Sequence, residues 1–145
     1  MTHFHAYALI SILCLTSLLQ TSALAQSRTL AQVTDLGAKP LSRQEALDVV
    51  SGAQTEFILV NGSERRWTNE PDGTFIASRT RARERTKAQG TWSIDQDGAY
   101  CLTFDWTHMD TEQWCRRLYR AEDSYYAFAL SAKPETSSGR YRFTK

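Results

Sequence analysis

The sequence has no excess of charge of either sign. Seventeen Lys and Arg residues are balanced by sixteen Asp and Glu residues, and none of these lies among the first 25 residues. This balance argues against a protein that binds nucleic acid over a broadly basic surface. Repeats and low-complexity segments are also lacking, and the hydrophobic fraction of 41% is that of a globular domain, which excludes a disordered or fibrous chain.

Lysine and arginine are missing from a hydrophobic stretch close to the N-terminus. Residues 5–19 are uncharged and mostly apolar, and Ala23 and Ala25 then provide the small residues of an A-x-A cleavage pattern. The stretch is shorter than the ~20 residues that span a bilayer. We therefore predict a signal peptide over residues 1–25, no membrane span after cleavage before Gln26, and a periplasmic or secreted protein. An uncleaved membrane anchor is the alternative.

Cysteine is rare. Removal of the signal peptide takes away Cys14 and leaves two cysteines, Cys101 and Cys115. An even cysteine count in an exported domain predicts a disulfide, and closing a loop of about 15 residues contributes about 3 kcal/mol to stability. Two reduced, buried thiols are the alternative. The sequence contains no C-x-x-C motif, so a thiol oxidoreductase is not indicated.

After residue 25, histidine is rarer still. His108 is the only histidine after residue 25, so a serine or cysteine triad would have to recruit it. Asp105, Asp110 and Glu112 surround it with residue types that ligate metals, although a solvated turn has the same composition. A pair of catalytic carboxylates is not excluded, but no pair stands out. We therefore predict a non-enzymatic protein with no catalytic residue, no metal, no cofactor and no nucleic-acid partner.

What the sequence does contain is a series of short segments separated by turn residues. Residues 26–40 are polar and predict a flexible lead-in. A capping box of Ser42 and Glu45 begins a helix over residues 41–52, which Gly52 ends. Turn signals such as Asn61-Gly62 then separate short strands, as in a sheet built from hairpins. The expected strands are 56–60, 65–68, 74–83, 90–94, 99–106, 112–119, 124–131 and 140–144.

This pattern predicts a mainly β fold over residues 41–145. We expect a single antiparallel meander of about eight strands, barrel-like or strongly curved, with one N-terminal helix. Closure is favoured because it leaves no exposed strand edge, and a barrel of about eight strands just fills its interior with side chains.

The two cysteines suggest a register for one hairpin. If Cys101 and Cys115 are opposite residues, the turn is centred on His108, and Leu102 lies on the core face opposite Trp114. The same register puts Arg116 on the core face, which is unfavourable. Either a bulge intervenes or the disulfide joins offset positions.

Four arginines alternate along one expected strand. On an extended strand, a period of two places them on one face, roughly 6.5 to 7 Å apart, where their planar donor groups suit carboxylate or phosphate. The predicted function is a binding module for an anionic small molecule or an envelope component, and a solvated outer face is the alternative. The four residues are Arg79, Arg81, Arg83 and Arg85, and the strand of Arg65 and Arg66 would extend the row if it pairs alongside.

Several short motifs follow one another from Leu41 onward. They are the helix end from Leu47 to Gly52, Pro71-Asp72-Gly73-Thr74, Gly90-Thr91-Trp92, Tyr100-Cys101, Trp106, Cys115 and Tyr119. In this combination the chain resembles a family of small exported bacterial proteins recorded only as a domain of unknown function. The resemblance implies a periplasmic location and a β-rich fold with a disulfide, and it implies no activity.

A second resemblance lies at the C-terminus. Ser138-Gly139-Arg140-Tyr141, followed by Lys145, is similar to the Ser-Gly...Tyr loop and trailing Lys of the small periplasmic lysozyme inhibitors. In that class, the loop enters the cleft of lysozyme, and its Ser and Lys contact the catalytic carboxylates. Here Tyr141 follows Gly139 by one residue too few, and Lys145 is the last residue. The alternative function is thus a periplasmic inhibitor of a cell-wall hydrolase, with Ser138, Gly139, Tyr141 and Lys145 as the inhibitory residues and a lysozyme-type enzyme as the partner.

Overall fold

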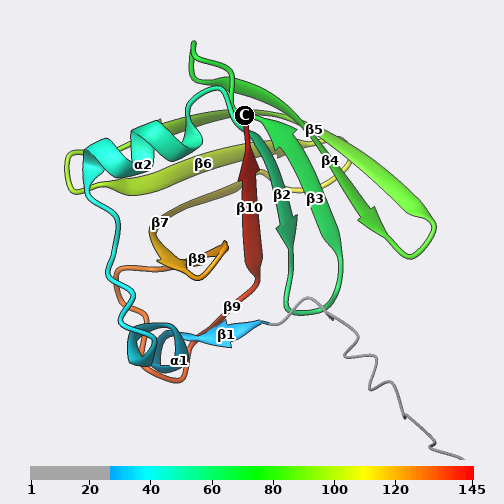
Figure 1. The fold of residues 1–145 in the computed structure, drawn as a ribbon. Coiled ribbons are helices and arrows are strands. Elements are labelled where there is room, and N and C mark those ends of the chain that lie inside the picture. Colours follow the sequence, from blue (N-terminus) through cyan, green and yellow to red (C-terminus); the bar gives the residue numbers. More distant parts are fainter. Residues whose placement is uncertain (1–26) are drawn as a thin grey trace, which may run out of the picture.

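The computed structural model describes residues 27–145, so the predicted signal peptide lies outside the described residues. Eight antiparallel strands form a closed barrel in which β2 to β8 follow one another, and β10 closes the barrel by pairing with both β8 and β2 (Figure 1). The predicted antiparallel meander is confirmed. The barrel strands are β2 (Gln54–Ile58), β3 (Glu64–Thr68), β4 (Thr74–Arg81), β5 (Glu84–Ile94), β6 (Ala99–Trp106), β7 (Glu112–Ala121), β8 (Ser124–Phe128) and β10 (Arg140–Thr144).

One turn differs from the prediction. The sequence predicts a strand over residues 74–83, but β4 ends at Arg81 and the chain reverses at Ala82 and Arg83. Ala82 has φ 54°, a left-handed conformation that Gly usually provides. Because no Gly, Pro or Asn marks this turn, the sequence pattern does not reveal it. The Asn61-Gly62 turn, in contrast, is found where it is predicted, with φ 78° at Gly62.

The helix α2 (Arg43–Val50) lies across one end of the barrel (Figure 1). The predicted capping box is present, since the Ser42 side chain accepts a bond from the Glu45 backbone and the Glu45 carboxylate accepts one from the Ser42 backbone. Ala46 and Val50 are fully buried against the barrel core. The helix therefore covers this end of the barrel.

The expected flexible lead-in over residues 26–40 is corrected by the structure. A short strand, β1 (Arg28–Thr29), pairs with β9 (Ser137–Ser138) and is followed by α1 (Leu30–Asp35). Val33 is fully buried in a second hydrophobic cluster, which lies against Tyr126 and Phe128 of β8. A six-residue helix with one buried side chain is too short to leave a hydrophobic period in the sequence, and this is why the pattern predicts a loop.

A polar network lies inside the closed end. The side-chain oxygen of Asn69 accepts hydrogen bonds from Trp67 Nε1 (3.0 Å) and from the hydroxyl of Tyr100 (2.5 Å). Its amide nitrogen donates to Thr55 Oγ1 (2.7 Å) and to the backbone oxygen of Ala53 (3.3 Å). Asn69 is fully buried, and each of its polar atoms has a partner. The network therefore carries no unpaired polar group.

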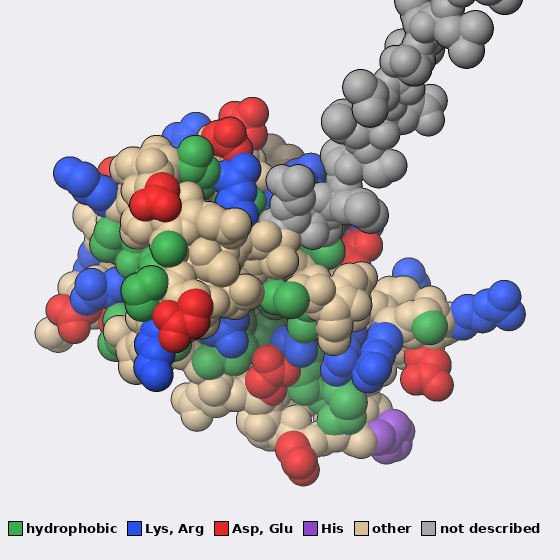
Figure 2. Space-filling view, turned by 90° about the horizontal axis from the view of Figure 1, so that it is seen from below, with side chains coloured by type: hydrophobic (Ala, Val, Ile, Leu, Met, Phe, Trp, Pro, Cys, Tyr) green, Lys and Arg blue, Asp and Glu red, His purple; other side chains and the backbone are tan. Residues whose placement is uncertain are grey.

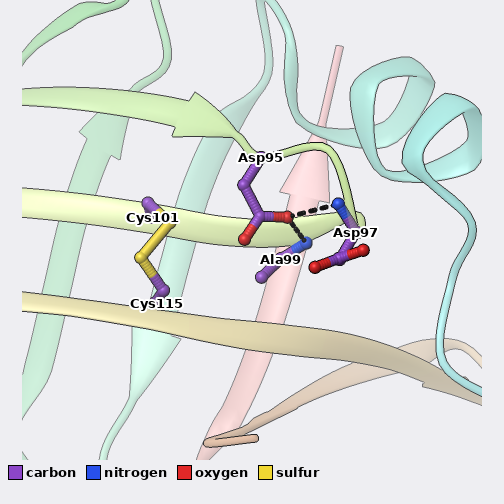
Figure 3. The surroundings of a disulfide bond; sticks show 5 residues. All are labelled: Asp95, Asp97, Ala99, Cys101 and Cys115. Atoms are coloured by element: carbon purple, nitrogen blue, oxygen red, sulfur yellow. Dashed lines mark hydrogen bonds between the residues drawn. A yellow bond between two sulfur atoms is a disulfide. The ribbon is translucent and has the colours of Figure 1, made fainter.

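A disulfide joins Cys101 on β6 to Cys115 on β7 (Figure 3). It lies next to the β5–β6 turn, in which the Asp95 carboxylate accepts hydrogen bonds from the backbone of Asp97 and Ala99. The two cysteines are directly opposite, and Leu102 is opposite Trp114, as expected. Neither the bulge nor the offset bond that Arg116 suggests is present. The register continues without interruption to the pair of Tyr100 and Arg116, so Arg116 does lie on the inner face.

Candidate functional site

Charged side chains face inward at the end of the barrel opposite α2. Arg65 on β3 is opposite Arg79 on β4, and both lie on the face of the core pair Trp67 and Ala77, because side chains two residues apart on a strand share a face. Glu112 and Arg116 lie on the inner face of β7 in the same way. We call Arg65, Arg79, Glu112 and Arg116 the inner arginine site. Figure 2, seen from below Figure 1, shows basic, acidic and hydrophobic side chains next to one another on this end.

The site is built around a partly buried ion pair. Arg65 Nη1 lies 2.9 Å from Glu112 Oε1, and the Arg65 side chain is only 7% exposed. The Arg65 guanidinium carbon also lies 5.1 Å from the centroid of the Trp106 ring. Trp106 and Trp114 donate their indole N–H groups to the Glu112 carboxylate, at 3.3 and 3.2 Å. Packing and hydrogen bonds therefore hold both charged groups in place.

The environment of Glu112 keeps its carboxylate ionised. Partial burial raises the pKa of Glu112. The hydrogen bond and the charge of Arg65, together with the two indole donors, lower the pKa by more than burial raises it, so the net shift is downward. A lowered pKa in the folded protein means that the pair's contribution to stability is complete above the ordinary pKa of Glu. That contribution is lost as the pH falls through the lower pKa of the folded state.

Arg116 and Tyr141 complete the inner surface. The Arg116 guanidinium lies over the ring of Trp114, with 4.6 Å between its carbon and the ring centroid. Tyr141 on β10 is fully buried, and its ring stacks on Phe57 with centroids 4.0 Å apart. Burial raises the pKa of Tyr141, and the positive charges of Arg116 and Arg65 only partly oppose this shift. Its hydroxyl therefore remains protonated and able to donate a hydrogen bond.

Three buried polar atoms at this end have no hydrogen-bond partner within residues 27–145. They are Arg65 Nε, Arg79 Nε and the hydroxyl oxygen of Tyr141. Buried polar atoms in folded proteins are nearly always paired, because an unpaired one costs about 1–3 kcal/mol. Arg28 Nη1 and Arg117 Nε, which are not part of the inner arginine site, are the other two such atoms in the described residues, whereas the Asn69 network at the closed end is fully paired.

A cavity of about 390 Å³ is lined by Arg65, whereas Arg79 and Tyr141 are not among its lining residues. It has an apolar part formed by Phe57, Leu59 and Trp114, and a charged part formed by Arg65, Glu112 and Arg116. A volume of this order is in the range of small-molecule sites. The remaining lining residues are Val60, Asn61, Ser137, Ser138 and Gly139.

A larger depression of about 780 Å³ lies on the outer surface of the barrel. Its lining is largely uncharged and rich in threonine, including Thr74, Thr91 and Thr103, which are neighbours across β4, β5 and β6. None of the unpaired buried polar atoms belongs to its lining residues. We therefore place the candidate site in the smaller cavity at the open end.

The predicted arginine row is not one face of one strand. Arg79 and Arg81 lie on β4, Arg83 lies in the turn, and Arg85 lies on β5 opposite Thr80. Arg85 therefore faces the side of the sheet opposite to Arg79 and Arg81. The prediction of one continuous strand was wrong because the chain reverses at Ala82, a turn that no glycine, proline or asparagine marks. Only Arg79 belongs to the inner arginine site, where Arg65 extends the row as its cross-strand neighbour.

The predicted inhibitory residues do not form a protruding loop. Ser138 is 3% exposed, and its hydroxyl accepts a hydrogen bond from the backbone of Ala127 at 3.0 Å. Tyr141 points into the barrel, and Lys145 Nζ donates to the backbone oxygen of Asp48 at 2.5 Å. Gly139 is packed against β2, because a Cβ there would come within 2.1 Å of the Ile58 backbone oxygen. These residues are therefore placed to hold β9 and β10 against the barrel.

The sequence pattern points to Glu112 only as one of the acids around His108, and it places Arg116 and Trp114 on the core face rather than in a binding site. The one signal in the sequence for a charged interior is the position of Arg116 on a face otherwise formed by core residues. In the sequence alone, a bulge or an offset disulfide explains that position instead. Among residues 27–145, no group of three or more His, Cys, Asp or Glu side chains is arranged to hold a metal ion. None of the helices over this range is both long enough and apolar enough to cross a bilayer.

Comparison with known proteins relates the chain to one family. A family model described as "Protein of unknown function (DUF995)" matches residues 14–116, a range that includes the four residues of the inner arginine site. No curated protein matches the chain, and no solved structure matches it.

Proposed function

The chain belongs to the DUF995 family of unknown function, and on this premise we propose that the barrel is a binding module for a small anionic molecule held at its open end. One observation carries the proposal: two guanidinium nitrogens and a tyrosine hydroxyl are buried there without partners. The two guanidinium N–H groups can only donate, so their missing partner is an acceptor, whereas the Tyr141 hydroxyl lies near Arg116 and can either accept from it or donate to a ligand. A carboxylate or phosphate supplies several acceptor oxygens at once.

The charge of the inner arginine site also supports an anion. The site contains three arginines and one acid, Glu112. Of the three arginines, only Arg65 forms an ion pair with Glu112. Arg79 and Arg116 are half-buried and make no ion pair within the described residues. An anionic ligand would offset this excess of positive charge in a place that water solvates poorly.

The apolar walls indicate what kind of anion fits. Phe57, Leu59 and Trp114 line the same cavity as Arg65 and Arg116, so a ligand with a short apolar or aromatic body next to its charged group would contact both parts. Small-molecule sites commonly combine mostly apolar walls with a few polar groups that fix orientation. A carboxylate with an aromatic or short aliphatic body is therefore the class that we propose.

A binding role is preferred to a catalytic one because of the protonation states. The pKa of Glu112 is lowered and that of Tyr141 is raised, so neither group is poised to exchange a proton near neutral pH. The compartment we propose is periplasmic or extracellular, which the disulfide supports because such bonds persist in oxidising surroundings.

The first prediction concerns Arg116. Replacing it by Met keeps an apolar stem over Trp114 and removes one charged donor, and the ion pair of Arg65 and Glu112 remains intact. We expect binding of benzoate, measured by titration calorimetry, to weaken by about 10- to 100-fold, as the loss of a hydrogen bond to a charged group implies. Benzamide has nearly the same shape without the charge, and we expect it to bind neither protein.

Arg66→Met is the matched control for this experiment. Arg66 follows Arg65 in the chain but points to the outer face, where its side chain is 59% exposed. We expect Arg66→Met to bind benzoate like the unaltered protein. Equal binding by Arg116→Met, or equal binding of benzamide and benzoate, would show that the inner arginines do not recognise the anion.

The second prediction concerns Glu112, whose carboxylate forms the ion pair with Arg65 described above. Glu112→Gln retains an oxygen that can accept the bond from Arg65 but removes the negative charge that repels an incoming anion. We expect benzoate to bind about 10-fold more tightly to this variant, because a nearby like charge disfavours a second anion. Weaker binding would mean that Glu112 itself contacts the ligand, contrary to the proposal.

A further inference from the structure

A basic hairpin projects from the barrel beside the open end. The β4–β5 pair extends beyond the neighbouring strands, because the β3–β4 ladder ends at Thr80 and the β5–β6 ladder ends at Ala88 (Figure 1). Residues 81–87 therefore pair in the sheet only within the β4–β5 hairpin, and beyond it the Lys87 backbone oxygen accepts a hydrogen bond from the Thr107 backbone N–H. We call residues 79–87 the basic hairpin.

The charge of the chain is concentrated in this hairpin. Five of the seventeen Lys and Arg residues lie in these nine positions with a single acid, Glu84, so the hairpin carries +4 while the rest of the chain carries −3. The four outermost basic side chains are exposed, and none makes an ion pair within the described residues. They are Arg81, Arg83, Arg85 and Lys87.

The arrangement of these charges favours an extended partner over a small one. Arg81 and Arg85 point to opposite faces of the hairpin, and Arg83 lies at its turn. No single small anion can contact all of them. A planar layer of negative groups can do so when the tip of the hairpin approaches it, since each basic side chain is long and flexible.

A second observation suggests what that layer contains. A depression of about 450 Å³ between the hairpin and the β6–β7 turn is lined by Arg85, Lys87, His108 and Met109, together with two threonines. Met109 is 43% exposed although it is hydrophobic. Basic side chains next to an exposed apolar one are typical of surfaces that meet the headgroup region of a membrane.

We propose that the basic hairpin docks the protein onto a bilayer surface rich in anionic phospholipid. Arg85 and Lys87 contact the lipid phosphate, Met109 reaches toward the acyl boundary, and Arg81 and Arg83 bind neighbouring headgroups. None of these contact residues belongs to the inner arginine site, with which the hairpin shares only Arg79 at its base. The contact would bring the open end of the barrel toward the membrane, because Arg79 at the base of the hairpin is the cross-strand neighbour of Arg65.

The test is co-sedimentation with vesicles. Protein exported and processed by its host, with its N-terminus verified by mass, is mixed with vesicles of phosphatidylglycerol and phosphatidylcholine or of phosphatidylcholine alone. We expect binding only to the former, and loss of that binding when ionic strength rises severalfold. Changing Arg81, Arg83, Arg85 and Lys87 to Ser is expected to weaken binding by about 100- to 1000-fold at low salt.

A charge-matched control separates docking from net charge. Changing Lys39, Arg43, Arg120 and Lys133 to Ser removes the same charge from exposed positions outside the hairpin. We expect this variant to bind anionic vesicles within a few-fold of the unaltered protein, and Arg116→Met to bind them unchanged. Near-ultraviolet circular dichroism verifies that each variant is folded.

Three outcomes would overturn the proposal. The first is an equal loss of binding in the charge-matched control, which would show a net-charge effect only. The second is unchanged binding by the hairpin variant. The third is retention on a heparin column, abolished by the hairpin substitutions, without vesicle binding, which would assign the hairpin to a soluble polyanion.

Discussion

Replacing both Cys101 and Cys115 by Ser is expected to lower the free energy of unfolding by about 3 kcal/mol. The disulfide joins residues 14 apart in sequence, and removing it restores the conformational freedom of that loop in the unfolded chain. Cys115 is exposed on the outer face and Cys101 is half-buried there, so the substitutions leave no cavity in the core. The loss is therefore attributable to the cross-link.

Urea denaturation measures this loss as a lower midpoint of unfolding. Unaltered protein treated with a reductant is the matched control and is expected to unfold at the same urea concentration as the double variant. Thermal unfolding should shift by roughly 10 °C or more for a domain of this size. A loss below about 1 kcal/mol would show that the loop is already constrained in the unfolded chain.

Replacing Asn69 by Leu is expected to destabilise the protein by about 3–5 kcal/mol. The substitution removes the acceptor of the Tyr100 hydroxyl, one of the two acceptors of Trp67 Nε1 and the donor to Thr55, and Trp67 Nε1 keeps only its bond to the Tyr100 oxygen. All of these groups are at or near zero exposure, so water cannot replace the lost bonds. Each unsatisfied buried group costs about 1–3 kcal/mol, and broken buried networks are among the few causes of losses above 4 kcal/mol.

Chemical denaturation of Asn69→Leu and of Asn61→Ala tests this expectation. Asn61 is exposed and accepts hydrogen bonds only from the Ser63 backbone and hydroxyl, and Ser63 is 5% exposed, so replacing Asn61 is expected to cost about 1 kcal/mol. If Asn69→Leu were equally mild, the closed end would tolerate unpaired polar groups. The unpaired atoms at the open end would then carry less weight as evidence for a ligand.

The barrel could be predicted from the sequence because local signals determine most of it. The capping box of Ser42 and Glu45 identifies α2, and Gly-containing turns such as Asn61-Gly62 separate most strands. Signals that are short or unusual were missed. The helix α1 has one buried residue, Val33, and the turn at Ala82 uses a left-handed conformation without glycine.

The candidate site was harder to predict because its residues come from distant strands. The three arginines, Arg65, Arg79 and Arg116, come together only when the barrel closes. Their spacing in the sequence does not predict that they lie at one site. The position of Arg116 on a core face was visible from the register of the disulfide hairpin, but a buried charge is normally unfavourable without partners. The ring of Trp114 and the open end of the barrel explain why it is tolerated.

The most direct test of the account observes the unpaired guanidinium groups themselves. Nuclear magnetic resonance of protein labelled with ¹⁵N-arginine resolves the Nε–H signals, which single Arg→Lys variants assign to Arg65, Arg79 and the exposed Arg66. During titration with benzoate, we expect the signals of Arg65 and Arg79 to shift together and to saturate, while that of Arg66 stays in place. The absence of a saturable shift at Arg65 and Arg79, or an equal shift at Arg66, would contradict an anion site inside the open end of the barrel.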